Sequence, residues 1–249
     1  VKYPLADFNI TPDVAIVDPD LVMGLPVKQV AYTGMDALTH AIEAYVSTLN
    51  CPFTDPLALQ AIEMVLDYLP ASYKCDMVAR EQMHYAQCLA GMAFSNALLG
   101  IVHSMAHKTG AAFADHGAHI IHGAANAMYL PKVIAYNAKD ETAKERYGVI
   151  ADFMKLGGDT LDEKVDLLIK YLRSMNDALN IPHCIKNYGA DSYPTEEGFV
   201  PEDVFLERLP EIAANAILDA CTGSNPRQPD QEEMEKLLKC CYYDTEVDF

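Results

Sequence analysis

The fold of this chain is decided by residues 34–48, GMDALTHAIEAYVST, in which apolar side chains recur at three- and four-residue spacing. This spacing is typical of a helix that buries one face against a core. The same pattern continues along most of the chain, and it predicts a mainly α fold. The predicted helices cover residues 34–48, 54–69, 78–99, 100–113, a segment that begins near 122, and residues 162–179, 201–220 and 231–241.

One convincing strand precedes these helices, at residues 14–17, VAIV, between Pro12-Asp13 and Asp18-Pro19. A single strand needs partners in a sheet, and no second strand of comparable quality follows. We therefore expect its partners to lie in sequence outside this chain. Because the chain opens at Val1 without any lead-in, we interpret it as a fragment.

The composition is that of a globular protein that can bury a large core, with 249 residues, 51% apolar side chains and a formal net charge of -18. The negative charge argues against nucleic acid as a partner, since phosphate binding needs clustered Lys and Arg. No apolar run of about twenty residues and no signal-peptide pattern occurs. We expect a cytoplasmic protein without a membrane partner, whose seven cysteines are reduced.

Asp36 and His40 stand four residues apart in the first predicted helix, so their side chains project from one face. Such a pair can bind one metal ion. On these two residues alone, a hydrogen bond on the helix surface is the commoner interpretation.

His103 and His107 repeat this spacing in residues 100–107, GIVHSMAH, which are otherwise largely apolar. Imidazoles buried in such a segment need polar partners, which could be a metal ion or, equally, the backbone or water. Five of the eight histidines fall between residues 103 and 122, a concentration that core packing does not explain. One carboxylate with three imidazoles would suit Fe(II) or Zn(II) and leave positions open for a substrate oxygen.

Six segments of the chain, in order, resemble the iron-containing alcohol dehydrogenases, and most of all the C-terminal dehydrogenase domain of bifunctional aldehyde-alcohol dehydrogenases. They are residues 2–7 (KYPLAD), 11–18 (TPDVAIVD), 34–45, 91–108, 122–137 and 221–227 (CTGSNPR). The resemblance implies a dehydroquinate synthase-like fold, in which a helical domain binds the metal beside an N-terminal nucleotide-binding domain. Residues 1–29 would then be the end of the nucleotide-binding domain, and residues 30–249 the helical metal-binding domain.

The resemblance also implies roles for individual residues. His116 and His122 compete for one ligand position, because the segment after His107 is longer than the family's usual spacing. We prefer His122, since Asn126 and Ala127 continue the family pattern after it. The implied ligands of one catalytic metal are Asp36, His40, His103 and His122.

Three further residues match positions near the reacting groups in the family. His107 would relay a proton to or from the substrate oxygen, although a purely structural imidazole is the alternative. Phe94 and Cys221 would line the substrate pocket, but an apolar ring and a small thiol serve equally well in a core.

The reaction implied by the resemblance interconverts short-chain aldehydes and primary alcohols, such as acetaldehyde and ethanol. The metal, Fe(II) or else Zn(II), polarises the carbonyl while NADH delivers hydride. No Gly-rich phosphate-binding motif is present, so we expect NAD(H) to be bound mainly by the missing N-terminal domain, and the isolated chain to be inactive. The expected assembly is a homo-oligomer with an upstream nucleotide-binding domain, and in a bifunctional enzyme also an aldehyde dehydrogenase domain.

Two other functions remain open from the residues themselves. A metal hydrolase could use the same ligands to activate water, but it would need a carboxylate base beside the metal, and the chain has no H-E-x-x-H motif. A catalytically silent helical assembly module of a bifunctional enzyme is the second alternative.

Overall fold

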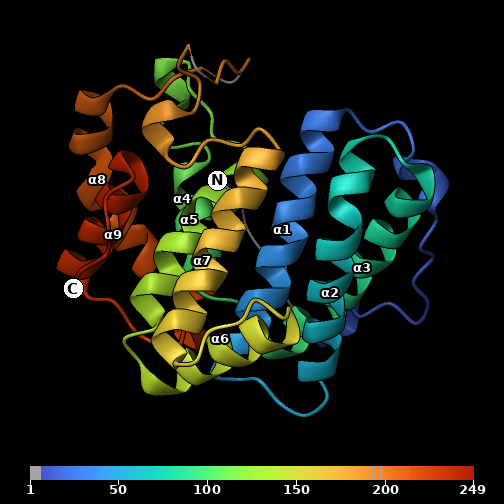
Figure 1. The fold of residues 1–249 in the computed structure, drawn as a ribbon. Coiled ribbons are helices and arrows are strands. Elements are labelled where there is room, and N and C mark those ends of the chain that lie inside the picture. Colours follow the sequence, from blue (N-terminus) through green and yellow to red (C-terminus); the bar gives the residue numbers. More distant parts are fainter. Residues whose placement is uncertain (1–6, 192, 197) are drawn as a thin grey trace.

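The computed structural model describes residues 7–191, 193–196 and 198–249, and it confirms the mainly α prediction (Figure 1). No strand occurs within these ranges. The α-helices are α1 (Val27–Val46), α2 (Asp55–Tyr73), α3 (Met77–Ala97), α4 (Ile101–Thr109), α5 (His122–Asn137), α6 (Glu141–Phe153), α7 (Leu161–Ala178), α8 (Glu202–Ile217) and α9 (Gln231–Tyr243). The 3-10 helices are η1 (Phe8–Ile10), η2 (Pro19–Val22), η3 (Ala114–His116), η4 (Ile185–Asn187) and η5 (Thr222–Ser224).

The strand predicted at residues 14–17 is not formed. These residues have no strand pairing and lie at the surface, where Val14 is 76% and Ile16 88% exposed. An apolar tetrapeptide becomes a strand only when another strand pairs with it, and none lies in the described part of the chain. The following segment is held against the helices, because Arg80 of α3 donates hydrogen bonds to the carbonyl oxygens of Met23 and Leu25.

The predicted helices are present with shifted ends, but α6 was missed. Its sequence carries a usable start signal, since the Asp140 side chain accepts a hydrogen bond from the Ala143 N–H and caps the helix. Its apolar residues form a weaker one-sided pattern than those of α7, so the apolar periodicity gives little signal. Helix α4 ends at Thr109, four residues earlier than predicted. The domain division between residues 29 and 30 stays a prediction.

Helix α1 is the centre of the structure. It packs against α2 and α3 on one side and against α5 and α6 on another (Figure 1). Its surface is buried almost all round, as expected for a central helix rather than an amphipathic surface helix. Helix α4 lies against α5 and α8, and α9 packs on α8 and α5. Side chains of α1 can therefore meet residues from both halves of the chain.

Helices α3 and α4 meet at a bend of 103°. Leu98 lies in the break with a positive φ of 60°, which ends α3. By length and composition these two helices together could form a bent membrane span, whereas no single helix in the described residues is long and apolar enough for one. The bend turns the first residues of α4 toward α1, where the Val102 N–H donates to Glu43.

The C-terminal end of α9 is fastened to the body of the protein by Asp244. Its carboxylate accepts two hydrogen bonds of 2.8 Å from Arg173 of α7, and it lies 2.7 Å from Lys132 Nζ of α5. Burial opposes ionisation of Asp244, but the hydrogen bonds from Arg173 and Lys132 outweigh it and lower the pKa to about 2. One carboxylate thus joins three helices.

Replacing Asp244 by Asn should destabilise the protein by about 1–3 kcal/mol at pH 7, because two cations lose their anion. The residue has a φ of 60°, which Asn tolerates, so the backbone should stay in place. Since the folded-state pKa lies below the ordinary value of 3.8, the contribution is present above pH 4 and lost as the pH falls toward 2. Urea unfolding of wild type and variant at pH 7 and pH 2.5 measures this, with the exposed Asp162→Asn as control. A difference at pH 2.5 as large as the difference at pH 7 would contradict the prediction.

Candidate metal centre

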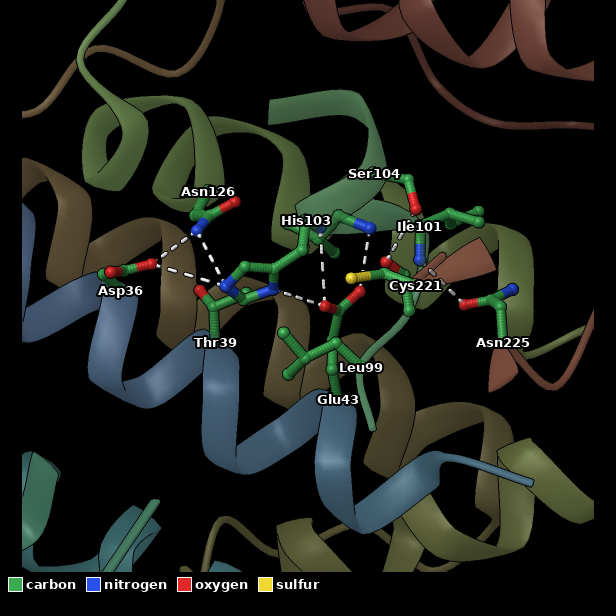
Figure 2. Close-up of polar contacts among 12 residues, drawn as sticks. Asp36, Thr39, Glu43, Leu99, Ile101, His103, Ser104, Asn126, Cys221 and Asn225 are labelled. Atoms are coloured by element: carbon green, nitrogen blue, oxygen red, sulfur yellow. Dashed lines mark hydrogen bonds and ion pairs between the residues drawn. The ribbon is translucent and has the colours of Figure 1, made fainter. Parts of the chain in front are cut away.

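Three of the four predicted ligands lie together. They are Asp36 on α1, His103 on α4 and His122 at the start of α5, and one donor atom of each lies within 4.8 Å of the other two. Asp36 Oδ1 is 3.5 Å from Nε2 of His103 and 3.5 Å from Nε2 of His122. Figure 2 shows the side chains of Asp36 and His103 pointing toward one another across α1 and α4. The helix packing thus gathers residues that are far apart in the sequence.

Gly123 permits this approach. A Cβ atom at this position would collide with the backbone carbonyl of Tyr32, so the first turn of α5 contacts the backbone of α1 directly. Tyr32 lies one helical turn before Asp36. A larger residue at position 123 would therefore move His122 away from Asp36.

His40 lies beside this cluster but is not one of its three donors. Its ring stacks on that of His103, with centroids 4.4 Å apart, and also on Phe94 of α3, with centroids 4.5 Å apart. Phe94 is partly buried against the core. His40 therefore stands next to His103, and Phe94 lies against the His40 ring.

Glu43 is the residue of this centre that the sequence analysis missed. It is a buried carboxylate on α1, and its Oε2 lies 2.6 Å from Nδ1 of His103, while Oε1 accepts a 2.8 Å hydrogen bond from the Val102 N–H (Figure 2). Gly100 leaves room for it, since a Cβ there would lie 2.7 Å from Oε1. The one available signal was an acid in the middle of an otherwise apolar helix. Because Nδ1–H is donated to Glu43, His103 presents Nε2 to Asp36.

The electrostatics of the cluster favour a positive charge between Asp36 and Glu43. Burial disfavours the imidazolium form of His103, but the hydrogen bonds with Asp36 and Glu43 outweigh it and raise its pKa to about 9. Burial likewise opposes ionisation of Asp36, and the hydrogen bond with His103 together with the nearby imidazoles holds its pKa well below the usual range. The two carboxylates therefore favour a positive charge on the His103 ring.

Asn126, one turn after His122 on α5, reaches into the same cluster. Its Nδ2 donates a 2.5 Å hydrogen bond to Asp36 Oδ1 and lies 3.2 Å from Nε2 of His103 (Figure 2). It lies 3.2 Å from Nε2 of His122 as well. Its Oδ1 is buried and has no hydrogen-bond partner among the described residues. The nitrogen end of the amide thus faces the three donor atoms, whereas its oxygen end has no hydrogen-bond partner among the described residues.

A second group adjoins the first. The ring of His107 stacks on that of His122, with centroids 5.2 Å apart and planes 9° apart. His107 Nδ1 lies 3.2 Å from the carboxylate of Asp219, and donor atoms of His107, Asp219 and Cys221 lie within 4.8 Å of one another. Lys108 Nζ is 2.8 Å from Asp219. Asp219 was not predicted from the sequence, because His107, which it contacts, lies 112 positions away in the chain.

The pKa values of this second group are also perturbed. Burial opposes ionisation of Asp219, but hydrogen bonds from His107 and Lys108 lower its pKa well below the usual range. Burial, together with the Asp219 charge, raises the pKa of the Cys221 thiol far above its ordinary value. Asp219 is therefore an anion that accepts from His107 Nδ1–H, whereas Cys221 stays a neutral thiol.

His116 and His119 lie away from both groups. His116 is 41% exposed, and its Nε2 is 3.8 Å from Asp115. His119 is also exposed. Neither belongs to the donor clusters found among the described residues, so His122 is the member of the competing pair that lies beside Asp36.

Comparison with known sequences and structures identifies the family of this chain. Residues 30–242 match the family model described as the C-terminal part of the Fe-containing alcohol dehydrogenases. The chain belongs to this family. It is 58% identical over 249 residues to an NADPH-dependent butanol dehydrogenase of Clostridium saccharobutylicum, and 43% identical over 260 residues to a bifunctional aldehyde-alcohol dehydrogenase of Escherichia coli. The iron-containing alcohol dehydrogenase of Thermococcus thioreducens superimposes with a TM-score of 0.80 at 34% identity and matches 95% of this chain.

The chain accounts for only part of each of these proteins. It spans 60% of the butanol dehydrogenase, 28% of the bifunctional enzyme and 56% of the Thermococcus structure. The 28% share places the matching region within a much longer multidomain protein. The family match therefore concerns the helical residues 30–242, which form only part of each related protein.

Replacing Glu43 by Gln should destabilise the protein by about 2–4 kcal/mol, because an amide can accept from only one of the two buried N–H donors of α4 and presents its own NH2 to the other. Urea unfolding measures this, and the exposed Glu145→Gln on α6 is the matched control. Equal midpoints for the two variants would show that Glu43 does not hold α4 to α1.

Proposed function

We propose that this chain is the metal-binding domain of an NAD(P)H-linked alcohol dehydrogenase that interconverts short-chain aldehydes and primary alcohols. The observation that carries the proposal is the convergence of Asp36, His103 and His122 within a helical domain of the iron-containing family. Their carboxylate and imidazole donors suit Fe(II), which we assign from the family, or Zn(II).

The spacing of the donors fits one such ion. With bonds of about 2.1 Å, neighbouring ligand atoms lie about 3.0 Å apart in an octahedral site and about 3.4 Å apart in a tetrahedral one, and Asp36 Oδ1 is 3.5 Å from each of the two Nε2 atoms. A site with more than four positions leaves room for a substrate oxygen. We assign His40 as the fourth ligand, because it follows Asp36 by one turn and its ring lies against His103. When bound, the ion would act as a Lewis acid on the substrate carbonyl.

The chain's own residues would orient the reacting groups. Glu43 fixes the tautomer of His103, so that Nε2 is the ligand atom. Asp219 does the same for His107, whose Nε2 is then free to pass a proton to or from the substrate oxygen. His107 is suited to this role because it stacks on His122 yet is 15% exposed. Phe94 and Cys221 would give the pocket an apolar lining that excludes water.

The cofactor and the remaining domains belong to this proposal as well. We propose that residues 1–29 continue an upstream nucleotide-binding domain, which holds most of the cofactor, and that the whole protein forms a homo-oligomer. The butanol dehydrogenase at 58% identity is described as NADPH-dependent, so NADPH stands beside NADH as a candidate. The same relative makes butyraldehyde as suitable a test substrate as acetaldehyde.

The intact protein should oxidise NADH or NADPH when acetaldehyde or butyraldehyde is added under anaerobic conditions with Fe(II). His103→Ala should lose stoichiometric metal, and with it about 100-fold or more of the activity, because a ligand is removed. The control His84→Ala replaces a histidine of α3 that lies outside the donor clusters. Full metal content and turnover in His103→Ala would refute the proposed site.

The choice between His122 and His116 makes a sharper test. In the intact protein, His122→Ala should lose most of its bound metal, whereas His116→Ala should keep it, because His116 is exposed and paired with Asp115. Elemental analysis of both purified variants measures this. The opposite ranking would mean that His116, and not His122, is the metal ligand.

Residues 1–249 alone should not turn over alcohol, even when reconstituted with Fe(II). Hydride transfer needs the nicotinamide within about 3–3.5 Å of the reacting carbon, and such positioning is worth roughly 7–11 kcal/mol of barrier. The described residues provide no strand of a nucleotide-binding sheet. NADH or NADPH oxidation by this segment, measured beside the intact protein, tests the claim. A rate within about a tenfold range of the intact protein would place the cofactor site within these residues.

A further inference from the structure

The amide of Asn126 occupies a ligand position rather than a packing position. Asn126 is fully buried, and its Nδ2 lies 3.2 Å from Nε2 of both His103 and His122. That separation is close to the distance of about 3.0–3.4 Å between neighbouring ligands of one ion with bonds of about 2.1 Å. The end of this side chain therefore stands next to the proposed ligands as a further ligand would.

The orientation of the amide is dictated by Asp36. Its N–H donates to Asp36 Oδ1 at 2.5 Å, and the opposite orientation would bring two oxygens to this distance. In this orientation the amide oxygen Oδ1 is buried and accepts no hydrogen bond from the described residues. A buried carbonyl without a hydrogen bond costs about 1–3 kcal/mol. In this orientation Nδ2 has a hydrogen-bond acceptor, whereas Oδ1 has no donor among the described residues.

A divalent cation would reverse this preference. An N–H directed at a cation is repelled, whereas an amide oxygen is a good ligand for it. The two ends of an amide have nearly the same shape, and a half-turn about the last side-chain torsion exchanges them without moving the helix. The exchange would give Oδ1 the cation as its partner, and it would also remove the repulsion between the N–H and the cation.

Other buried asparagines do not share this setting. Asn137 and Asn225 pair with one another through their amide groups, which is what a structural role produces. Asn176 of α7 also has an Oδ1 without a partner, but its Nδ2 donates to the backbone carbonyl of Ala127. Asn126 differs because its amide faces three proposed metal donors.

We propose that Asn126 is a metal-site residue with two orientations, N–H toward Asp36 in the metal-free protein and Oδ1 toward the ion in the loaded protein. This inference rests on the proposed function, since it needs the ion bound by Asp36, His103 and His122. It adds a fifth protein group to the site and a rearrangement that accompanies metal uptake.

The test is the Zn(II) affinity of the intact protein, stripped of metal and titrated against a chromophoric chelator. N126A removes both ends of the amide and should bind Zn(II) about tenfold or more weakly. N126D keeps an oxygen in the same place and should bind at least as tightly as wild type. N176A, the matched control on α7, should leave the affinity unchanged. In the metal-free state, N126A and N126D should both unfold at lower temperature than wild type, because Asp36 loses its donor.

Other results would refute either the role of the Asn126 amide or the metal site itself. Wild-type affinity in folded N126A, or equal weakness of N126A and N126D, would refute the role of the amide oxygen while leaving the metal site intact. A wild-type protein that takes up no stoichiometric Zn(II) would refute the proposed function itself.

A measurement on the wild-type protein does not depend on how N126A folds. The side-chain NH2 signals of Asn126 in ¹⁵N–¹H spectra are those that disappear in N126D. Saturation with Zn(II) should shift them strongly, because they exchange Asp36 for a new environment, and should shift those of Asn176 much less. Unchanged Asn126 signals would overturn the two-orientation inference.

Discussion

The contact between Glu43 and His103 is the interaction on which the rest of the centre depends. A carboxylate inside an apolar helix is costly unless it is fully hydrogen-bonded. Glu43 meets that requirement with the His103 ring and the Val102 N–H at the start of α4, where the helix dipole also favours an anion. The same bonds that make the buried charge tolerable also fix α4 against α1 and set which nitrogen of His103 faces Asp36. Fold and site therefore share one interaction.

The sequence predicted the features that are local. Helix periodicity placed the helices, and the four-residue spacings identified Asp36 with His40 and His103 with His107 before any contact was visible. The strand at residues 14–17 was not formed because a strand depends on a second strand that pairs with it, and none occurs among the described residues. Helix α6 was missed because its apolar residues form only a weak one-sided pattern. Which histidine completes the site came from the family resemblance, since spacing alone could not separate His116 from His122.

What the sequence could not predict are the residues whose partners are distant in the chain. Glu43 meets His103 across 60 positions, Asn126 meets Asp36 across 90, and Asp219 meets His107 across 112. An acid or an amide in a helix has many ordinary explanations, and only packing shows which one applies. In each pair, the hydrogen bond of a residue that was predicted for the site is made by a residue for which no role had been predicted.

The two histidines of α4 show how such neighbours divide the work. His103 and His107 stand one turn apart, and a carboxylate fixes Nδ1 of each, Glu43 for the first and Asp219 for the second. The difference lies in what surrounds them. The charge of Asp219 is already balanced by Lys108, and the neighbouring Cys221 stays a protonated thiol, so the second group has little attraction for a cation. Nε2 of His103 instead faces Asp36, which no lysine or arginine contact balances among the described residues. In the proposed function, two imidazoles with the same local geometry would thereby have different tasks, one to hold an ion and the other to exchange a proton beside it.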